Sequence, residues 1–155
     1  MAPRKTFREK LADSKDFPRV QPLEGGMLKR FGPGTILLPA PHEVDDLMRK
    51  VPKGKLTTIN QIREKLAARH GATVCCPIVG GIHARIAAGA AGEDETDGKK
   101  RVTPYWRTLK SNGELNPKYP GGVTGQAKRL RAEGHTVITK GQRYIVRDYV
   151  KSLVA

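Results

Sequence analysis

The sequence predicts a mainly α-helical domain with a small β component. Apolar residues recur at helical spacing in four segments, near residues 41–50, 57–70, 74–89 and 123–133, as in helices that bury one face. A fifth segment, 137–146, has the pattern of a β-hairpin that turns at Lys140-Gly141. Only a few residues join the second helix to the third, which predicts a helix-turn-helix.

Positive charge is the strongest global signal. The chain has 155 residues, a length that suits one domain, and it carries 29 basic and 15 acidic residues for a net charge of +14. Four of the acids lie in one run: Glu93, Asp94, Glu95 and Asp97. A basic protein of this kind attracts polyanions. DNA or RNA is therefore the first candidate partner, and an anionic membrane is the second.

Several other classes of protein are disfavoured by the sequence. No stretch approaches the ~18 apolar residues of a membrane span, and the basic residues near Met1 are not followed by the apolar core of a secretory signal. Cys75 and Cys76 are adjacent, so they do not readily form a framework disulfide, and they fit no zinc spacing. We find no Walker loop, serine elbow or catalytic pair of carboxylates. The sequence thus predicts a cytoplasmic protein without a metal or cofactor.

Residues 1–34 are expected to form a peripheral, basic N-terminal extension. Thr6 can cap a short helix through Ala12, but prolines and glycines interrupt everything after it. The basic residues at the start of this segment admit two interpretations, a nucleic-acid arm and, as the favoured one, a solvated tail. They are Arg4, Lys5, Arg8 and Lys10.

Local signals bound the first two helices that follow. Pro41 opens a helix through about Lys50, with acids in its first turns and basic residues in its last, as the helix dipole favours. Thr57 or Thr58 caps the next helix, which stops at Gly71. Its expected inner face consists of Ile59, Ile62, Leu66 and Ala67.

The helix near residues 74–89 consists mainly of small residues. Pro77 suits its first turn, and an apolar stripe follows: Ile78, Val79, Ile82 and Ile86. Around that stripe lie residues with almost no side chain: Gly80, Gly81, Ala84, Ala87 and Ala88. Each glycine inside a helix costs roughly 1 kcal/mol relative to alanine, so the pair needs a reason. Close approach to a nucleic-acid groove and close packing against a neighbouring helix are both open.

The rest of the chain is expected to alternate loops with short elements. Residues 89–100 form an acidic, flexible loop, Asn112-Gly113 marks a tight turn, and a basic helix over 123–133 ends at Gly134. A terminal helix spans 147–154. The domain boundaries follow as an N-terminal extension over 1–34, a DNA-binding domain over 35–135, and a C-terminal hairpin and helix packed on it over 136–155.

Six motifs in order resemble a known family. They are V-P-K-G-K-L-T-T-I-N-Q-I (51–62), I-V-G-G-I (78–82), P-Y-W-R (104–107), the Asn-Gly turn, Y-P-G-G (119–122) and A-E-G-H (132–135). This order resembles the DNA-binding domain of methylated-DNA–protein-cysteine methyltransferases, over about Pro39 to His135. The resemblance implies a winged-helix-like domain of the alkyltransferase type. In that family the small helix enters the minor groove, and a damaged guanine is flipped into a pocket.

The sequence departs from the family at the reactive centre. The family's repair motif is Pro-Cys-His-Arg, whereas Tyr105 stands at the cysteine position and Trp106 at the histidine position. Neither side chain accepts an alkyl group as a thiolate does. The family's base-rotating tyrosine falls on Ile59, and its base-replacing arginine falls on Pro77. The chain is therefore similar to the alkyltransferase-like proteins, which lack the acceptor cysteine, bind alkylated DNA without repairing it and pass it to excision repair.

Taken together, these patterns predict a non-enzymatic protein that binds DNA, alkylated or damaged DNA in particular, without alkyl transfer. The expected partners are double-stranded DNA and DNA-repair proteins, with no membrane contact, and the protein is expected to be a monomer. The candidate DNA-binding residues are Thr57, Thr58, Ile59, Asn60, Gln61, Pro77, Gly80, Gly81, His83 and Arg85. The candidate pocket residues are Tyr105, Trp106, Arg107, Tyr119, Gly121, Gly122 and Glu133.

Three alternatives accompany this hypothesis. Tyr105 and Trp106 can line a base pocket by stacking, or they can fill the former active-site cavity. Cys75 or Cys76, near a helix N-terminus where a thiol pKa is lowered, can serve a diverged alkyltransferase; as the favoured interpretation, both are small residues packed at a helix start. An RNA- or protein-binding module on the same fold is the third alternative.

Overall fold

The computed structural model describes residues 5–155, so Arg4 and the three residues before it lie outside the described part. Helices dominate the order of elements. That order is α1 (Phe7–Ala12), β1 (Arg19–Pro22), α2 (Gly25–Phe31), β2 (Thr35–Leu38), α3 (Pro41–Arg49), β3 (Thr57–Thr58), α4 (Ile59–Arg69), β4 (Val74–Cys75), α5 (Pro77–Thr96), η1 (Tyr105–Arg107), β5 (Thr108–Leu109), η2 (Ser111–Gly113), α6 (Gly122–Ala132), β6 (Val137–Lys140), β7 (Arg143–Val146) and η3 (Tyr149–Ser152).

The strands form small, separate sheets between the helices. β2 pairs with β1 in antiparallel and with β4 in parallel orientation, while β3 and β5 form a short parallel pair. β6 and β7 form the predicted hairpin, in which Lys140 pairs with Arg143 across a two-residue turn. The predicted class, mainly α with a small β component, is confirmed. Within residues 5–155, none of the helices has the length and apolar character needed to cross a membrane.

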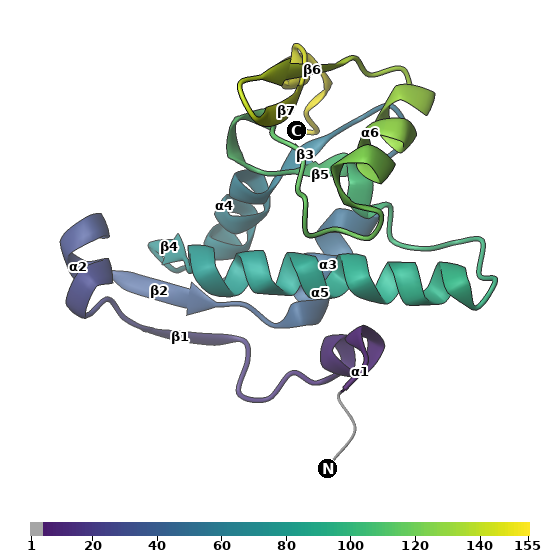
Figure 1. Ribbon diagram of the computed structural model, residues 1–155. Helices are drawn as coiled ribbons and strands as arrows, with labels where there is room; N and C mark the ends of the chain where they lie inside the picture. The colour runs from purple at the N-terminus through teal and green to yellow at the C-terminus, as the bar shows by residue number, and fades with distance from the viewer. Residues whose placement is uncertain (1–4) are drawn as a thin grey trace.

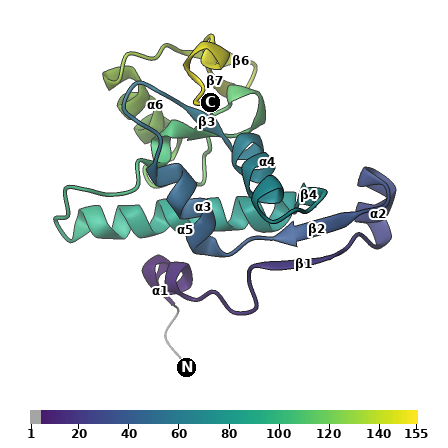
Figure 2. The ribbon, with the colours of Figure 1, turned by 180° about the vertical axis from the view of Figure 1, so that it is seen from behind.

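Helix α5 is the central element of the molecule. It runs across the view in Figure 1, with α1 below it, α4 above it and α3 crossing behind it. The hairpin and the C-terminus lie at the opposite end of the molecule from α1, and the reverse view shows the same arrangement (Figure 2). α5 contacts α1, α3, α4 and η1. Its position therefore determines where the other helices lie.

The small residues explain how α5 packs. The face that carries Gly80, Ala84, Ala87, Ala88 and Ala91 is buried, and its alanines share one core cluster with side chains of α3 and α4, among them Val44, Met48, Ile62 and Leu66. Of the two predicted roles of the small residues, close packing against neighbouring helices is confirmed for this face.

The predicted flexible loop over residues 89–100 is wrong for residues 89–96, because α5 continues to Thr96. Contacts from distant parts of the chain stabilise this extension. The Glu93 carboxylate accepts hydrogen bonds from the backbone amides of Phe7 and Arg8, and the Glu95 carboxylate accepts two hydrogen bonds from Arg129 on α6. The acids that the sequence pattern assigned to a loop are thus the partners of α1 and α6.

The N-terminal segment is more ordered than predicted, although most of its side chains are exposed. Thr6 caps α1 as expected, with its hydroxyl accepting from the amide of Glu9 at 3.1 Å. The Phe7 ring lies directly over Gly89, and β1 continues the sheet at the edge of β2. For the described residues, the extension is therefore docked on α5 and is not a free tail.

Helices α3 and α4 match their predicted bounds closely. Thr58 caps α4, and its hydroxyl accepts from the amide of Gln61 at 3.2 Å. Two buried carboxylates of α3 join it to its neighbours. Glu43 bonds the His70 ring at the end of α4, and Asp45 accepts from the Thr103 hydroxyl at 2.6 Å. The pair α4–α5 corresponds to the predicted helix-turn-helix, with β4 in the connection.

The C-terminal part packs around a second core cluster. Leu56, Leu109 and Leu130 belong to it together with Val146 of the hairpin. The predicted Asn-Gly turn is present, because Asn112 and Gly113 both have positive φ, 67° and 79°. The predicted terminal helix is only the short 3₁₀ turn η3, and the chain after it hydrogen-bonds to Leu56.

Substituting Gly89 tests how α1 is held. A Cβ atom at Gly89 would overlap the Phe7 ring, and forcing an extra methyl into a packed contact costs about 1–3 kcal/mol. We expect Gly89→Ala to speed amide hydrogen exchange in α1 by about tenfold or more, with the core helices unaffected. Gly26→Ala is the matched control, because a Cβ there meets no atom within 4 Å. Unchanged exchange in α1 would show that Phe7 does not anchor it.

Candidate nucleic-acid interface

The first half of α5 exposes one face to solvent. Ile78 is 61% exposed and Ile82 is 52% exposed, and Gly81 and Arg85 are exposed beside them. Helical spacing places these four residues in one row, which we call the exposed stripe. Large apolar side chains on a surface helix normally face the core. Here the small face of α5 is buried and the larger side chains point outward.

The two adjacent glycines have different surroundings. Gly80 is buried, and a Cβ there would come within 3.4 Å of the Arg63 side chain. Gly81 is exposed, and a Cβ there would meet no atom within 4 Å. Gly80 therefore faces the packed interior beside Arg63, whereas position 81 is open to solvent and nothing in the described fold contacts it.

A groove of about 570 Å³ runs along one flank of the exposed stripe. Its wall on the α4–α5 side carries Ile59, Asn60, Pro77 and Gly81, four of the predicted DNA-binding residues. We call it the α4–α5 groove. The Asn112 turn and Tyr119 close its other side. The structure thus brings part of the predicted DNA-binding set together with one predicted pocket residue.

Three cationic side chains line this groove, Arg30, Arg63 and Lys110, against one acid, Glu114. Arg63 is fixed in place, because its guanidinium donates to the Cys75 carbonyl at 3.1 Å and to the Asn60 side chain at 2.9 Å. The Arg30 guanidinium lies 4.9 Å from the centre of the Phe31 ring. Sequence reasoning missed Arg30 and Lys110, which lie far from α5 along the chain. Only the overall excess of positive charge signalled residues of this kind.

Four of the predicted DNA-binding residues have side chains engaged within the protein. Thr57 and Thr58 are buried, and the Thr57 hydroxyl donates to Gln61 at 2.8 Å. Gln61 in turn donates to the Val154 carbonyl at 2.9 Å. His83 is buried against Phe17, and burial lowers its pKa. Their role in nucleic-acid contact stays a prediction, and it would require these side chains to leave their present partners.

Three of the predicted pocket residues, Tyr105, Trp106 and Tyr119, form a filled cluster behind α5. Tyr105 is 2% exposed, and its hydroxyl donates to the Pro120 carbonyl at 3.3 Å. Its ring meets Trp106 and Tyr119 edge to face, with centroids 5.3 and 5.7 Å apart. The Arg129 guanidinium covers the Trp106 ring at 4.3 Å. Of the two predicted roles of Tyr105 and Trp106, this geometry matches cavity filling.

Glu133, at the end of α6, is bound to this cluster by an ion pair and hydrogen bonds. Its carboxylate accepts from Arg107 at 2.7 and 2.9 Å and from the Trp106 indole N–H at 3.0 Å. Burial raises the pKa of Glu133, but the hydrogen bonds from Arg107 and Trp106 outweigh burial, so the pKa lies below its ordinary value. Trp106 thus donates a hydrogen bond to the carboxylate that, by the family resemblance, would orient a histidine.

The two glycines of the Y-P-G-G motif shape the turn into α6. Gly121 has φ 81° and Gly122 has φ 64°, a backbone region that side chains with a Cβ rarely adopt. Gly121 also lines a shallow depression together with Tyr105 and Arg129. This depression is separate from the α4–α5 groove, so the predicted pocket set is divided between two places.

The two cysteines do not fit the predicted reactive thiol. Cys75 belongs to β4 and Cys76 precedes α5, and both are buried. Desolvation by burial raises the pKa of the Cys75 thiol to about 11, so the predicted lowering near a helix start is wrong for this residue. The packing role given to these small residues matches their burial.

Comparison with known proteins yields two similar solved structures. The crystal structure of S. pombe Atl1 in complex with damaged DNA containing O6-carboxymethylguanine has a TM-score of 0.49 and 18% identity, over 74% of this chain and 94% of that one. A crystal structure of S. pombe ATL in complex with DNA has a TM-score of 0.46 and 17% identity over the same shares. No protein-family model matches the chain, and no curated protein is found to match it.

Removing the charge of Glu133 tests the cluster behind α5. Arg107 and Glu133 have side chains only 13% and 8% exposed, and breaking a buried ion pair from one side costs roughly 3–5 kcal/mol. We expect Glu133→Gln to lower the free energy of unfolding by about that amount at pH 7, measured by denaturant titration. Glu64→Gln, on the exposed side of α4, is the matched control.

The same variant has a predictable pH dependence. Because the pKa of Glu133 is lowered in the folded state, its contribution is complete above the ordinary value of 4.5 and is lost as the pH falls through the folded-state pKa. The stability difference between the wild type and Glu133→Gln should therefore shrink below about pH 4.5. A difference that stays constant down to pH 3 would contradict this assignment.

Proposed function

We propose that this protein binds double-stranded DNA without enzymatic activity, with the exposed stripe of α5 in the minor groove. The observation that carries the proposal is the open position of Gly81 between two solvent-exposed isoleucines. The isoleucines of this row expose apolar surface that packs against no other part of the described fold. A cationic groove beside it provides the attraction that a polyanion requires.

The shape of the stripe suits the minor groove. That groove is only about 6 Å wide in regular DNA, so an entering helix must approach closely and the groove must widen. Gly81 allows close approach, and isoleucines are among the side chains that minor-groove proteins insert between base steps to widen and kink the duplex. Arg30, Arg63 and Lys110 would then lie beside one phosphate backbone, which is where most protein–DNA hydrogen bonds are made.

Preference for alkylated or damaged DNA is the finer part of the proposal. The α4–α5 groove has a volume of about 570 Å³, which lies within the ordinary range of small-molecule sites. It can therefore hold an extrahelical base beside Pro77 and Tyr119. Flipping is least costly for a damaged or mismatched base, so a passive pocket of this size favours such sites. Hand-over to DNA-repair proteins and a monomeric state belong to the same proposal.

The absence of alkyl transfer follows from the available nucleophiles. The sequence contains two cysteines, and both are buried. Tyr105, at the position of the family's acceptor, is also buried, and desolvation raises the pKa of its phenol above the ordinary value. A neutral phenol that donates to the Pro120 carbonyl has no means of attacking an alkyl group.

Gly81→Leu separates binding from folding, because its two effects have opposite signs. Replacing an exposed helical glycine should stabilise the fold by up to about 1 kcal/mol, while the added side chain should hold the helix away from the groove. We expect a higher Tm together with duplex DNA affinity at least tenfold weaker, measured by fluorescence anisotropy at fixed salt. Ala68→Leu adds similar bulk on the exposed side of α4 and should leave affinity unchanged.

Further arms of that experiment address the alternatives. Arg85→Glu should weaken binding, since Arg85 lies in the exposed stripe and has no ion-pair partner within residues 5–155. Competition with RNA of the same sequence distinguishes an RNA-binding module, and a duplex with one O6-alkylguanine tests the lesion preference. Equal affinity of Gly81→Leu and wild type would remove the exposed stripe from the interface.

Thiol labelling tests the enzymatic alternative. With both cysteines buried and the Cys75 pKa about 11, the thiolate that reacts is scarce at neutral pH. We expect the folded protein to react with a thiol reagent at least about a hundredfold more slowly than the unfolded protein, and to gain no mass from alkylguanine DNA. Rapid labelling of the folded chain, or an alkyl group on Cys75 or Cys76, would support the diverged alkyltransferase instead.

A further inference from the structure

We propose that the cleft between α1 and α5 is a second nucleic-acid contact, which holds one phosphodiester strand of the bound duplex against lysines of the N-terminal segment. This inference rests on the proposed function. It assigns a DNA-binding role to a segment outside the part of the chain that resembles the alkyltransferase domain.

The cleft has a volume of about 400 Å³ and lies on the opposite flank of the exposed stripe from the α4–α5 groove. We call it the α1–α5 groove. Three exposed lysines line it, Lys5, Lys10 and Lys15, against a single acid, Asp13. Lys5 pairs with Asp13 at 2.7 Å, so Lys10 and Lys15 provide the uncompensated charge. Phosphate is the group that this excess of cations attracts.

The apolar wall of the groove connects it to the exposed stripe. Ile82 belongs to both surfaces, and Val79 and Ile86 continue the wall along α5. A helix that enters the minor groove has one phosphate backbone on each side. The α4–α5 groove offers three cations to one strand, and the α1–α5 groove offers Lys10 and Lys15 to the other. The two flanks thus fit the two strands of one duplex.

A buried histidine on the same wall is a second, independent observation. His83 lines the α1–α5 groove and is 5% exposed, and its Nδ1 atom has no hydrogen-bond partner among the described residues. Buried polar atoms without a partner are rare in folded proteins. The ring that carries this unpartnered atom lies on the wall of the groove that the lysines line.

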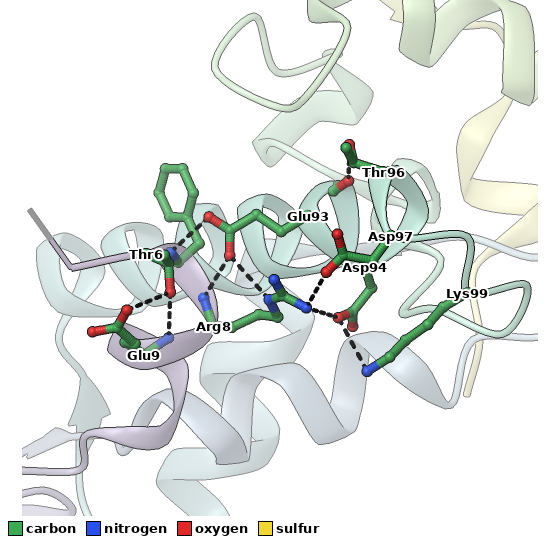
Figure 3. A network of polar contacts seen from close by, with 10 residues as sticks. Thr6, Arg8, Glu9, Glu93, Asp94, Thr96, Asp97 and Lys99 are labelled. Carbon is green, nitrogen blue, oxygen red and sulfur yellow. Dashed lines mark hydrogen bonds and ion pairs between the residues drawn. The ribbon is translucent and has the colours of Figure 1, made fainter.

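The acidic run at the end of α5 holds the lysine-bearing segment in place (Figure 3). Glu93 accepts from the first amides of α1, those of Phe7 at 3.0 Å and Arg8 at 2.9 Å. The Arg8 guanidinium lies 2.6 Å from Asp97 and 3.4 Å from Asp94. The acids therefore neutralise Arg8 and fix α1, and Lys10 and Lys15 are left facing the groove. Glu93 is thus a positioning residue for the lysines.

The salt dependence of duplex binding tests the lysines. Each phosphate contact adds about 0.9 to the slope of log affinity against log salt concentration, so the double variant Lys10→Gln/Lys15→Gln should flatten that slope by about 1.8. The matched control, Lys140→Gln/Lys151→Gln, removes two exposed lysines from the hairpin end of the molecule, far from α1 (Figure 1). It should keep the wild-type slope.

Glu93→Ala tests the positioning role, because positioning and simple electrostatics predict opposite changes in DNA affinity. Removal of an acid makes the protein more positive, which by itself strengthens DNA binding. If Glu93 holds α1, its loss should instead weaken binding and flatten the salt slope, although every lysine is present. Stronger binding by Glu93→Ala would contradict this role.

The outcomes separate the two proposals. If the wild type fails to bind duplex DNA at low salt, the proposed function fails and this inference fails with it. If the wild type binds with a steep slope but Lys10→Gln/Lys15→Gln matches its control, the exposed stripe is retained and the α1–α5 groove is rejected. A flattened slope in the double variant alone, with an unchanged Tm, supports the second contact.

Discussion

Close contact between the core and the small face of α5 determines the rest of the architecture. Side chains of α3 and α4 approach the backbone of α5 because alanines and Gly80 cover that face, and Gly89 and Gly92 leave room for Phe7 and Pro120. A helical glycine costs roughly 1 kcal/mol relative to alanine, which this packing offsets at the buried positions. The same arrangement turns Ile78 and Ile82 outward, so burial of the small face creates the exposed stripe.

Acidic and basic residues are distributed differently: many acids are paired within the protein, and many basic residues remain on the surface. Many of the scarce acids are engaged within the protein: Glu93, Asp94 and Asp97 with Arg8, Glu95 with Arg129, and Glu133 with Arg107. These pairs join α1 to α5, α5 to α6, and η1 to the end of α6. Because the acids are engaged in this way, the remaining lysines and arginines dominate the two grooves beside α5. Structure and electrostatics therefore point to the same face of the molecule.

Local signals in the sequence predicted much of the fold. Thr58, Gly134 and Lys140-Gly141 lie where caps and turns end the elements, because such residues act through their own backbone neighbours. The length of α5 could not be predicted in this way, since Phe7, Arg8 and Arg129 stabilise its acidic end from far along the chain. At the site, periodicity identified the apolar row of α5 but not which side of the helix would be buried. The sequence alone could not show that Gly80 is buried and Gly81 exposed, or that Arg30 and Lys15 lie beside α5, because these placements depend on tertiary contacts.

The central claim is that the solvent-exposed side of α5 meets duplex DNA. Amide chemical shifts of the isotopically labelled protein, followed as a short duplex is added, report this contact residue by residue. We expect the largest changes at Ile78–Arg85, with smaller ones in the two flanking grooves and none in the hairpin over 137–146. Changes confined to the hairpin, with α5 unaffected, would contradict the claim.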